Sequence, residues 1–263
     1  MKSIVITGAA GGMGAAATKA LAETGYRVFA IDLAPIEAVE GVIPIKADLT
    51  SEGSVAAAFE TIRASCDRVF AILHFAGLYM LDSFVEIGTE AFDRIFDVNF
   101  RGVFLVNKVF RPLLGDGSRI LITTSELAPL DPLPFTGIYA VSKAALDRYA
   151  FSLAMELQLL GIRVSVLRAG AVRTAMLGTS TEALSRFCRE TALYRTNSAR
   201  FQGIVARVEA RCVPPEAIAK RCLSILGRKK PKFAYAINRN PLLLLLNLLP
   251  KRLQLYLIGR ILK

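Results

Sequence analysis

The stretch "SIVITGAAGGMGAAATKALAE", residues 3–23, passes from an apolar run through a glycine-rich turn into a helical pattern. Its glycines are spaced as TGxxxGxG, with Gly8, Gly12 and Gly14. Glycines at such a turn permit a tight bend and the close approach of a pyrophosphate to backbone N–H groups at a helix N-terminus. The stretch therefore predicts a strand, a turn and a helix that bind a dinucleotide, although a glycine-rich turn without a ligand has the same local pattern.

Apolar runs alternate with helical patterns over the first 170 residues. The expected strands are Ser3–Thr7, Arg27–Asp32, Val42–Lys46, Arg68–Phe75, Arg119–Thr124 and Arg163–Arg168, and the expected helices lie near 12–24, 51–65, 88–112 and 136–160. Short apolar strands separated by helices imply right-handed βαβ units. The pattern predicts an α/β fold, a doubly wound parallel sheet of the Rossmann type with helices on both faces.

Length and composition favour one large domain followed by a tail. The chain has 263 residues, of which 53% are hydrophobic, enough for one sizeable core. We expect a single dehydrogenase-sized domain over 1–240, in which the mixed helical segment 175–212 forms a lid over a substrate site. Residues 241–263 form a hydrophobic and basic C-terminal tail.

The positive charge is concentrated near the C-terminus. Residues 228–263 contain nine Lys or Arg and no acidic residue, so that 24 basic residues face 22 acidic ones in the rest of the chain. A nearly neutral body disfavours a nucleic-acid partner. Four cysteines without CxxC spacing and a single histidine argue against a metal site, and from the first residues we expect no secretory signal. We therefore expect a cytoplasmic protein.

Asp32 closes the second expected strand, eighteen residues after Gly14. A carboxylate at this distance from a glycine loop accepts hydrogen bonds from the adenosine ribose hydroxyls and repels a 2′-phosphate. A lone aspartate is more often a cap of a turn or helix. After the glycine loop, Asp32 instead favours NAD(H) as the cofactor.

The stretch "IYAVSKAALDRYA", residues 138–150, places Tyr139 and Lys143 four residues apart on one helical face. Such a pair is either a surface contact or a phenol whose pKa is lowered by a fixed positive charge, which is a proton-transfer device. The pair alone leaves both interpretations open.

In combination, these motifs resemble the single-domain form of the short-chain dehydrogenase/reductase family over residues 3–226. Thr7–Gly14 matches the family's glycine motif, "DVNFRGVF" contains its asparagine, and "RAGAVRT" at 168–174 resembles the segment that holds the nicotinamide carboxamide. The resemblance implies a site without a metal and with these residues: catalytic Asn99, Ser125, Tyr139 and Lys143; cofactor-binding Gly8, Gly12, Met13, Gly14, Asp32, Asp48, Leu49, Ala76, Gly77, Tyr139, Lys143, Val172 and Thr174.

The resemblance also implies the role of each catalytic residue. Tyr139 is the acid/base, with its phenolate favoured by Lys143, which also holds the nicotinamide ribose. Ser125 polarises the substrate oxygen, and Asn99 supports a water that relays the proton. Two departures matter: "HFAG" replaces the usual NNAG, which introduces His74, and Thr124 competes with Ser125 for the hydroxyl role because its spacing from Tyr139 is the commoner one.

The tail "RNPLLLLLNLLPKRLQLYLIGRILK", residues 239–263, has an unbroken apolar run, Leu242–Leu246, that is far too short to span a bilayer. Three alternatives remain: a helix packed on the body or on a second subunit, an interfacial helix on anionic lipid, or a membrane anchor. Similar leucine-rich, basic ends occur in family members that act on steroids, retinoids and other lipid alcohols.

The sequence thus predicts an NAD(H)-dependent oxidoreductase that interconverts a secondary alcohol and a ketone on a hydrophobic, steroid-like or lipid substrate. The family resemblance adds a homo-oligomer as the expected assembly, and the tail adds peripheral membrane contact. The expected pocket wall is Leu78, Tyr79, Met80, Leu127, Leu130, Phe135, Met176 and Leu177. The alternatives are a 3-oxoacyl-carrier-protein-type reductase, against which Asp32 argues, and a dinucleotide-sensing or scaffold protein, which would not need Tyr139 and Lys143.

Overall fold

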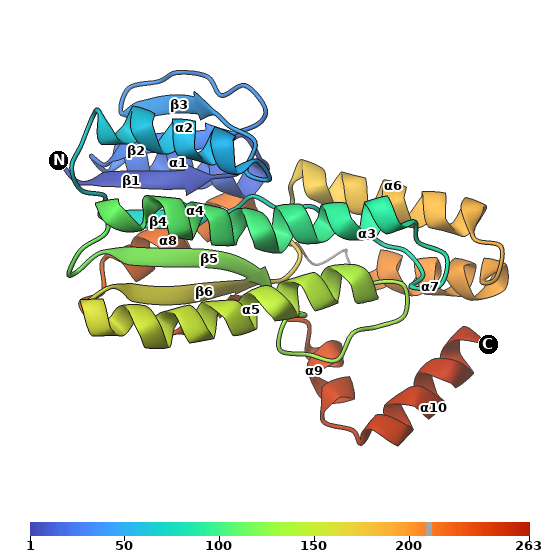
Figure 1. Ribbon diagram of the computed structural model, residues 1–263. Coiled ribbons are helices and arrows are strands. Elements are labelled where there is room, and N and C mark those ends of the chain that lie inside the picture. The colour runs from blue at the N-terminus through green and yellow to red at the C-terminus, as the bar shows by residue number, and fades with distance from the viewer. Residues whose placement is uncertain (209–211) are drawn as a thin grey trace.

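The computed structural model describes residues 1–208 and 212–263, without the side chains of residues 177, 179, 180 and 208. The described residues form a parallel seven-stranded sheet in the order β3-β2-β1-β4-β5-β6-β7 (Figure 1). The strands are β1 (Ser3–Thr7), β2 (Arg27–Asp32), β3 (Val42–Lys46), β4 (Ala71–His74), β5 (Arg119–Ser125), β6 (Arg163–Ala169) and β7 (Ala234–Ile237). The predicted doubly wound parallel sheet is confirmed. Its order reverses between β1 and β4, which opens a crevice at the carboxyl ends of these strands.

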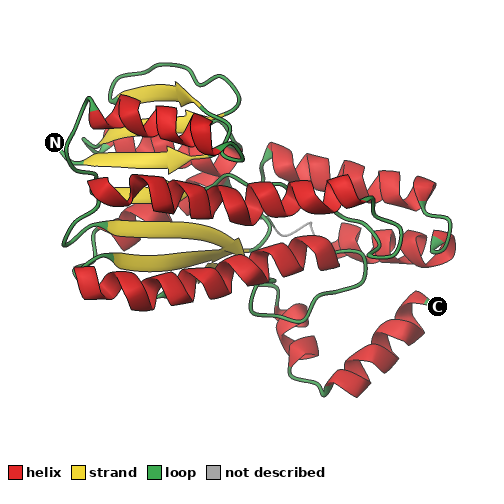
Figure 2. Cartoon of the chain, viewed as in Figure 1, coloured by secondary structure: helices red, strands yellow, loops and turns green. Residues whose placement is uncertain are grey.

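Helices cover both faces of the sheet (Figure 2). On one face lie α1 (Gly12–Glu23) and α8 (Pro215–Leu226), packed on Ile4 and Ile6. On the other lie α2 (Glu52–Arg63), α4 (Gly102–Phe110) and α5 (Gly137–Leu157), packed on Val5. Successive side chains of a strand point to opposite faces, so a strand buried on both sides is apolar throughout. This is why the strands are visible as continuous apolar runs.

The expected strands differ from the structure in several places. Strands β5 and β6 each extend one residue further, to Ser125 and Ala169. The run 68–75 contributes only Ala71–His74, and the edge strand β7, paired with β6 from Val166 opposite Ala234, was not expected at all. At the carboxyl ends of the strands the chain adds helices between β4 and β5 and after β6. They are α3 (Thr89–Phe96), the π-helical turn η1 (Asp97–Arg101), α6 (Ala175–Glu190) and α7 (Arg195–Val208). Short 3₁₀ turns extend α4 and α5 at Arg111–Leu113 and Gln158–Leu160.

The tail consists of α9 (Pro241–Asn247) and α10 (Lys251–Leu262), joined at Pro250. It packs on the body: Leu262 and Gln254 are buried, and the Asn197 side chain of α7 donates a hydrogen bond of 2.7 Å to the Leu262 carbonyl. Within the described part of the chain, no helix has the length and apolar character needed to cross a membrane. The inner side of the tail therefore packs on the body of the protein, as in the first of the three alternatives considered from the sequence.

His74, which stands at the buried end of β4, forms hydrogen bonds with the neighbouring elements β1 and α4. Its Nε2 lies 3.0 Å from Asn107 Oδ1 on α4, and its Nδ1 lies 3.4 Å from the Thr7 hydroxyl on β1. Because Asn107 Oδ1 can only accept, we assign the proton to Nε2 and let Nδ1 accept from Thr7. Burial lowers the pKa of His74 to about 4, and the bond to Asn107 opposes this shift.

We expect His74 to make the fold sensitive to acid. Between pH 6.5 and pH 4 the unfolded chain binds a proton on this histidine and the folded chain does not, so stability present above pH 6.5 is lost as the pH falls. A shift of this size corresponds to on the order of 3 kcal/mol. Urea unfolding of wild type and His74→Gln from pH 7 to pH 4 measures it. The variant should lose less stability over this range, and parallel curves would contradict the assignment.

Candidate active site

Ser125, Tyr139 and Lys143 meet at the carboxyl end of β5. Ser125 is the last residue of the strand, and its side chain is hydrogen-bonded to the Tyr139 hydroxyl. Lys143 is only 5% exposed, its Nζ donates to the Thr123 carbonyl at 3.4 Å, and it lies 5.9 Å from the centre of the Tyr139 ring. The Tyr139–Lys143 pair is therefore no surface contact. It forms part of an interior site.

The electrostatics of this pair differ from the expectation. Desolvation raises the pKa of Tyr139 to about 12, while the hydrogen bond with Ser125 lowers it by less. Burial also lowers the pKa of Lys143 to about 8. The expectation was a phenol made more acidic by Lys143, but the loss of water around both groups dominates. The protein surroundings alone thus hold Tyr139 in its protonated form, which is the form that donates a proton.

The two candidate hydroxyls have different partners. Thr124 donates to Asp147 Oδ1 at 3.2 Å, and Asp147 is paired through both carboxylate oxygens with Arg168, at 2.7 and 3.0 Å. The Thr124 hydroxyl is thereby held within a buried polar cluster. The Ser125 hydroxyl accepts from the Leu127 backbone at 3.2 Å and contacts Tyr139. Of the two, Ser125 has the hydroxyl that meets the phenol.

Asn99 is fully buried in the turn η1 and connects the end of β4 to α5. Its Oδ1 accepts from the Leu78 N–H at 2.7 Å, and its Nδ2 donates to the Leu78 carbonyl and to the Ser142 hydroxyl, both at 3.0 Å. Ser142 in turn donates to the Tyr139 carbonyl. Gly77 fits between Asn99 and Lys143, since a Cβ there would lie 3.1 Å from Lys143 Nζ. These contacts position α5, and the water relay stays a prediction.

The glycine loop lies where its spacing predicts, over the crevice between β1 and β4. Gly8 has φ of +71°, and a Cβ on it would lie 2.3 Å from the Ala76 nitrogen. A Cβ on Gly14 would meet the Gly8 carbonyl at 2.0 Å, and one on Gly12 would meet the Thr174 methyl at 2.6 Å. Only glycine fits at Gly8 and Gly14, where the Cβ would meet backbone atoms, while a side chain at Gly12 would require the Thr174 side chain to move. The close approach also brings Thr174 beside the first turn of α1, which has no side-chain cap.

Asp32 and Asp48 border the same end of the sheet. Asp32 accepts from the Ala10 N–H at 2.9 Å and from the Ala34 N–H at 3.0 Å, which ties the end of β2 to the glycine loop. Asp48 Oδ1 accepts from the backbone and the hydroxyl of Thr50, and these bonds lower its pKa, the backbone bond most. Leu49 lies beside it and packs over Gly102. An uncapped helix N-terminus next to a strand-end carboxylate fits a dinucleotide, with pyrophosphate at the former and ribose at the latter.

A cavity of about 460 Å³ opens above the Ser125–Tyr139 pair. Its apolar wall comes mainly from the body residues Met13, Leu127, Val172 and Met176, from α7 with Phe201, Ile204 and Val205, and from the tail with Leu242, Leu243, Leu246, Leu257, Ile258, Ile261 and Leu262. The tail contribution was missed from sequence. A uniformly apolar helix has no periodicity that says which surface it covers.

Part of the expected pocket wall is wrong. Tyr79, Leu127 and Met176 line the cavity, whereas Leu78, Met80, Leu130 and Phe135 do not, and the side chain of Leu177 lies outside the described residues. Phe135 is buried in a separate aromatic cluster, with ring centres 4.7 to 5.6 Å from those of Phe187, Tyr194 and Phe201. Its ring stabilises the base of the α6–α7 pair instead.

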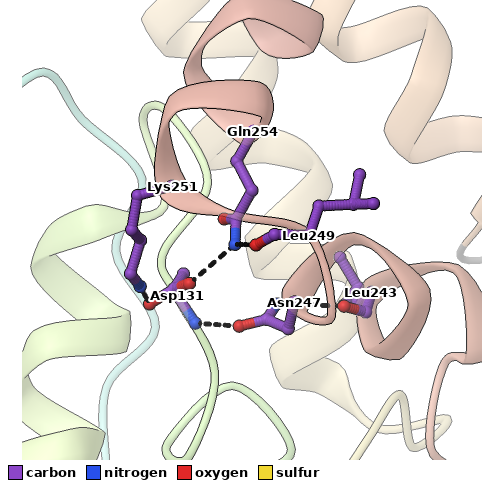
Figure 3. Close-up of polar contacts among 6 residues, drawn as sticks. All are labelled: Asp131, Leu243, Asn247, Leu249, Lys251 and Gln254. Carbon is purple, nitrogen blue, oxygen red and sulfur yellow. Dashed lines mark hydrogen bonds and ion pairs between the residues drawn. The ribbon is translucent and has the colours of Figure 1, made fainter.

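Two carboxylates of the loop between β5 and α5 hold the tail over the cavity. Glu126 Oε2 accepts from the Asn240 N–H at 2.6 Å, just before α9. Asp131 lies between the two tail helices, paired with Lys251 and accepting from Gln254 at 3.0 Å, while its backbone N–H donates to Asn247 at 2.6 Å (Figure 3). Neither residue stood out in the sequence, because acidic residues in a loop are usually solvated.

Comparison with known proteins identifies the family. The model of the family described as short chain dehydrogenase matches residues 2–185. The chain belongs to this family of oxidoreductases, whose members use NAD or NADP. A solved structure, that of a short chain dehydrogenase family protein from Francisella tularensis, covers 90% of this chain and 97% of its own with a TM-score of 0.76. At 22% identity this likeness shows the fold.

Two relatives are named for lipid substrates. The 3-ketodihydrosphingosine reductase of Bacteroides thetaiotaomicron is 27% identical over 232 residues, which are 88% of this chain and 85% of the relative. The NADPH-dependent 1-acyldihydroxyacetone phosphate reductase of Schizosaccharomyces pombe is 30% identical over 193 residues, which are 69% of this chain and 65% of the relative.

Proposed function

We propose that this protein is an NAD(H)-dependent oxidoreductase that interconverts a secondary alcohol and a ketone on a hydrophobic lipid or steroid-like molecule. One observation carries the proposal: the hydroxyls of Ser125 and Tyr139 meet at the floor of a cavity whose other walls are leucine-rich. An apolar cavity with a few convergent polar groups is the usual form of a small-molecule site. The lipid names of the two relatives support the same class of substrate.

The walls of the cavity favour a bulky, largely apolar substrate without a phosphate or other anionic group. Among its described lining residues there is no Lys or Arg that would bind a phosphate. Helices α6 and α7, with Met176, Phe201 and Ile204, supply one side, in keeping with the role of a substrate lid. The α9–α10 tail supplies the facing side, so the substrate lies between two helical covers with its reactive carbon toward Tyr139.

In this proposal each residue acts on the reacting oxygen or on its neighbours. Tyr139 donates its proton to the ketone oxygen during reduction and accepts one from the alcohol during oxidation. Ser125 holds that oxygen by a hydrogen bond, and Lys143 supplies a positive charge close to the phenol. Asn99 keeps the turn of α5 that carries Tyr139 in place. The nicotinamide supplies or accepts the hydride when it is bound.

Tyr139→Phe should lower kcat by at least about a thousandfold, because the proton donor is lost while the apolar ring and its packing are kept. The variant should still bind the cofactor, which can be measured from the change in NADH fluorescence on binding. Ser125→Ala should reduce activity more than Thr124→Ala. A substantial rate in Tyr139→Phe would contradict the catalytic role, and the opposite order of the two hydroxyl variants would move the substrate contact to Thr124.

We propose NAD(H) as the cofactor because of the place of Asp32. Its carboxylate ends β2 beside the glycine loop, where an adenosine ribose lies in this fold. A 2′-phosphate would bring a second negative charge to the same position. Asp48, Leu49, Ala76, Gly77, Val172 and Thr174 complete the proposed contacts, together with Gly8, Gly12, Met13 and Gly14 of the loop.

The wild type should prefer NAD(H) over NADP(H) by at least about tenfold in kcat/KM, which corresponds to about 1.4 kcal/mol. Asp32→Ala should lower this ratio, because it removes the repulsion between the Asp32 carboxylate and the 2′-phosphate of NADP(H). Initial rates with both cofactors over a range of concentrations measure the ratio. Equal values in the unaltered protein would overturn the assignment, and an unchanged ratio in Asp32→Ala would place the discrimination elsewhere.

We further propose that the outer side of the tail rests on an anionic lipid surface. Its exposed side chains are Leu245, Leu248, Leu253, Leu255 and Tyr256, with the basic Arg252, Arg260 and Lys263 among them. Apolar side chains flanked by Lys and Arg, without any acidic residue, suit an anionic interface. Leu242 and Ile261 line the cavity yet are 64% and 52% exposed, so the cavity opens at this same surface.

The wild type should therefore co-sediment with phosphatidylserine vesicles. The double variant Leu245→Ser/Leu255→Ser should bind these vesicles at least about tenfold more weakly, because less apolar surface is buried. Leu159→Ser is the control, because Leu159 is 82% exposed in the 3₁₀ turn that follows α5. High salt should weaken binding without abolishing it, since only the charge contribution is screened. Wild-type protein that stays in the supernatant would rule the membrane contact out.

Self-association is proposed on separate grounds. The exposed side chains Phe104 of α4 and Val141, Phe151 and Met155 of α5 give these two helices an apolar outer surface. Burial of such a surface against a second copy is the simplest way to remove it from water.

A further inference from the structure

Glu126 brings a single charge into an otherwise uncharged cavity. Among the described residues that line the cavity, it alone has an acidic or basic side chain. It follows Ser125 directly in the chain, and Ser125, Glu126 and Tyr139 all line the same cavity. Its half-buried carboxylate is fixed by the Asn240 N–H, which approaches Oε2 at 2.6 Å.

The second carboxylate oxygen of Glu126, Oε1, lies beside the backbone of Gly170. Within the described part of the chain, Oε1 accepts no hydrogen bond, and a Cβ built on Gly170 would approach it to 3.0 Å. Gly170 cannot carry a side chain, since that Cβ would also lie 1.9 Å from the Asn238 carbonyl. The Asn238 carbonyl packs closely on Gly170 at this point, so a ligand reaches Oε1 from the cavity that Glu126 lines.

The charge of Glu126 is incompletely compensated. Burial raises the pKa of Glu126, while the Asn240 N–H and, more weakly, the nearby Arg239 lower it. The carboxylate is also close enough to Tyr139 to raise the pKa of that phenol. A partly desolvated carboxylate is stabilised by a cation that donates a hydrogen bond to it, and such charge-assisted bonds are about twice as strong as neutral ones.

We propose that Glu126 binds an ammonium group of the substrate, so that the preferred substrate is an amino ketone or amino alcohol with a long apolar chain. The ammonium group lies within a few bonds of the reacting carbon, because Glu126 lines the same cavity as the Ser125 and Tyr139 hydroxyls. The chain extends between α7 and the tail. This inference rests on the proposed function and adds the polar end of the molecule to it. Anionic substrates are disfavoured by the same carboxylate.

Three long-chain ketones of equal length test the proposal. They carry an ammonium group, a hydroxyl group or a hydrogen on the carbon next to the ketone. The wild type should show kcat/KM for the amino ketone at least about tenfold above that for either other ketone. In Glu126→Gln the carboxamide oxygen can still accept from Asn240, so the cover stays supported, and the ratio of amino to unsubstituted ketone should fall toward one.

Two further variants separate charge from structure. Glu60→Gln, on the exposed face of α2, is the matched control and should leave the ratio unchanged. Glu126→Asp keeps the charge on a shorter side chain and should retain part of the preference even where Glu126→Gln is poorly folded. A hydroxy ketone used as well as the amino ketone, or a preference that survives in Glu126→Gln, would overturn the proposal.

Calorimetric binding of a long-chain primary amine and of the matching alcohol, in the presence of NADH, gives a readout without turnover. The amine should bind at least about tenfold more tightly to the wild type and lose this advantage in Glu126→Gln. If the unsubstituted ketone is turned over but the amine binds no more tightly than the alcohol, the ammonium site is ruled out and the proposed function is retained. If the amine binds in a manner that depends on Glu126 but no ketone is turned over, the proposed function is ruled out and the ammonium site is retained.

Discussion

The removal of water from Tyr139 and Lys143 is the constraint on which the site depends. Both side chains lie on one face of α5, pressed against the end of β5, and the same desolvation raises the pKa of the phenol and lowers that of the ammonium. Neither group is strongly perturbed by a single opposite charge. Their properties instead follow from how tightly α5 is packed, which Asn99 and Ser142 secure from the side of β4.

The loop between β5 and α5 extends this constraint to the rest of the cavity. It begins at Ser125, and it ends where α5 starts, two residues before Tyr139. Between these points Glu126 and Asp131 hold the beginning of α9 and the joint between α9 and α10. The reacting hydroxyls and the cover above them are therefore attached to the same short segment. A displacement of the tail would therefore move the loop between β5 and α5, whose two ends adjoin Ser125 and the first turn of α5.

The sequence predicted most of the sheet and the positions of the glycine loop and of the Tyr139–Lys143 pair for clear physical reasons. Strands buried on both faces are apolar throughout, so β1, β2 and β3 were predicted with their full bounds. Glycines needed for close backbone approach, such as Gly8 and Gly14, are visible because no other residue fits. The placement of Tyr139 on the same helical face as Lys143 follows from helix geometry alone.

What the sequence missed depends on contacts between distant segments. The edge strand β7 is four residues long and only partly buried, so it has a weak pattern. The leucines of α9 have no polar face that would fix their orientation, and the pKa of Tyr139 depends on burial that no local pattern reports. Glu126 and Asp131 looked like ordinary loop residues because their partners lie 114 to 123 positions away.

The cavity is divided between the body, which holds the proposed reacting groups, and the tail, which supplies much of the apolar lining. Evolution can change these two parts independently. In the proposed function, the sheet, the glycine loop and α5 carry the reacting groups. Helices α9 and α10 contribute seven of the apolar side chains that line the cavity. Because the tail is attached through a few polar contacts and the packing of Leu262 and Ile258, and does not pair with the sheet, exchange of these helices between related enzymes offers a route to new substrate ranges on an unaltered frame.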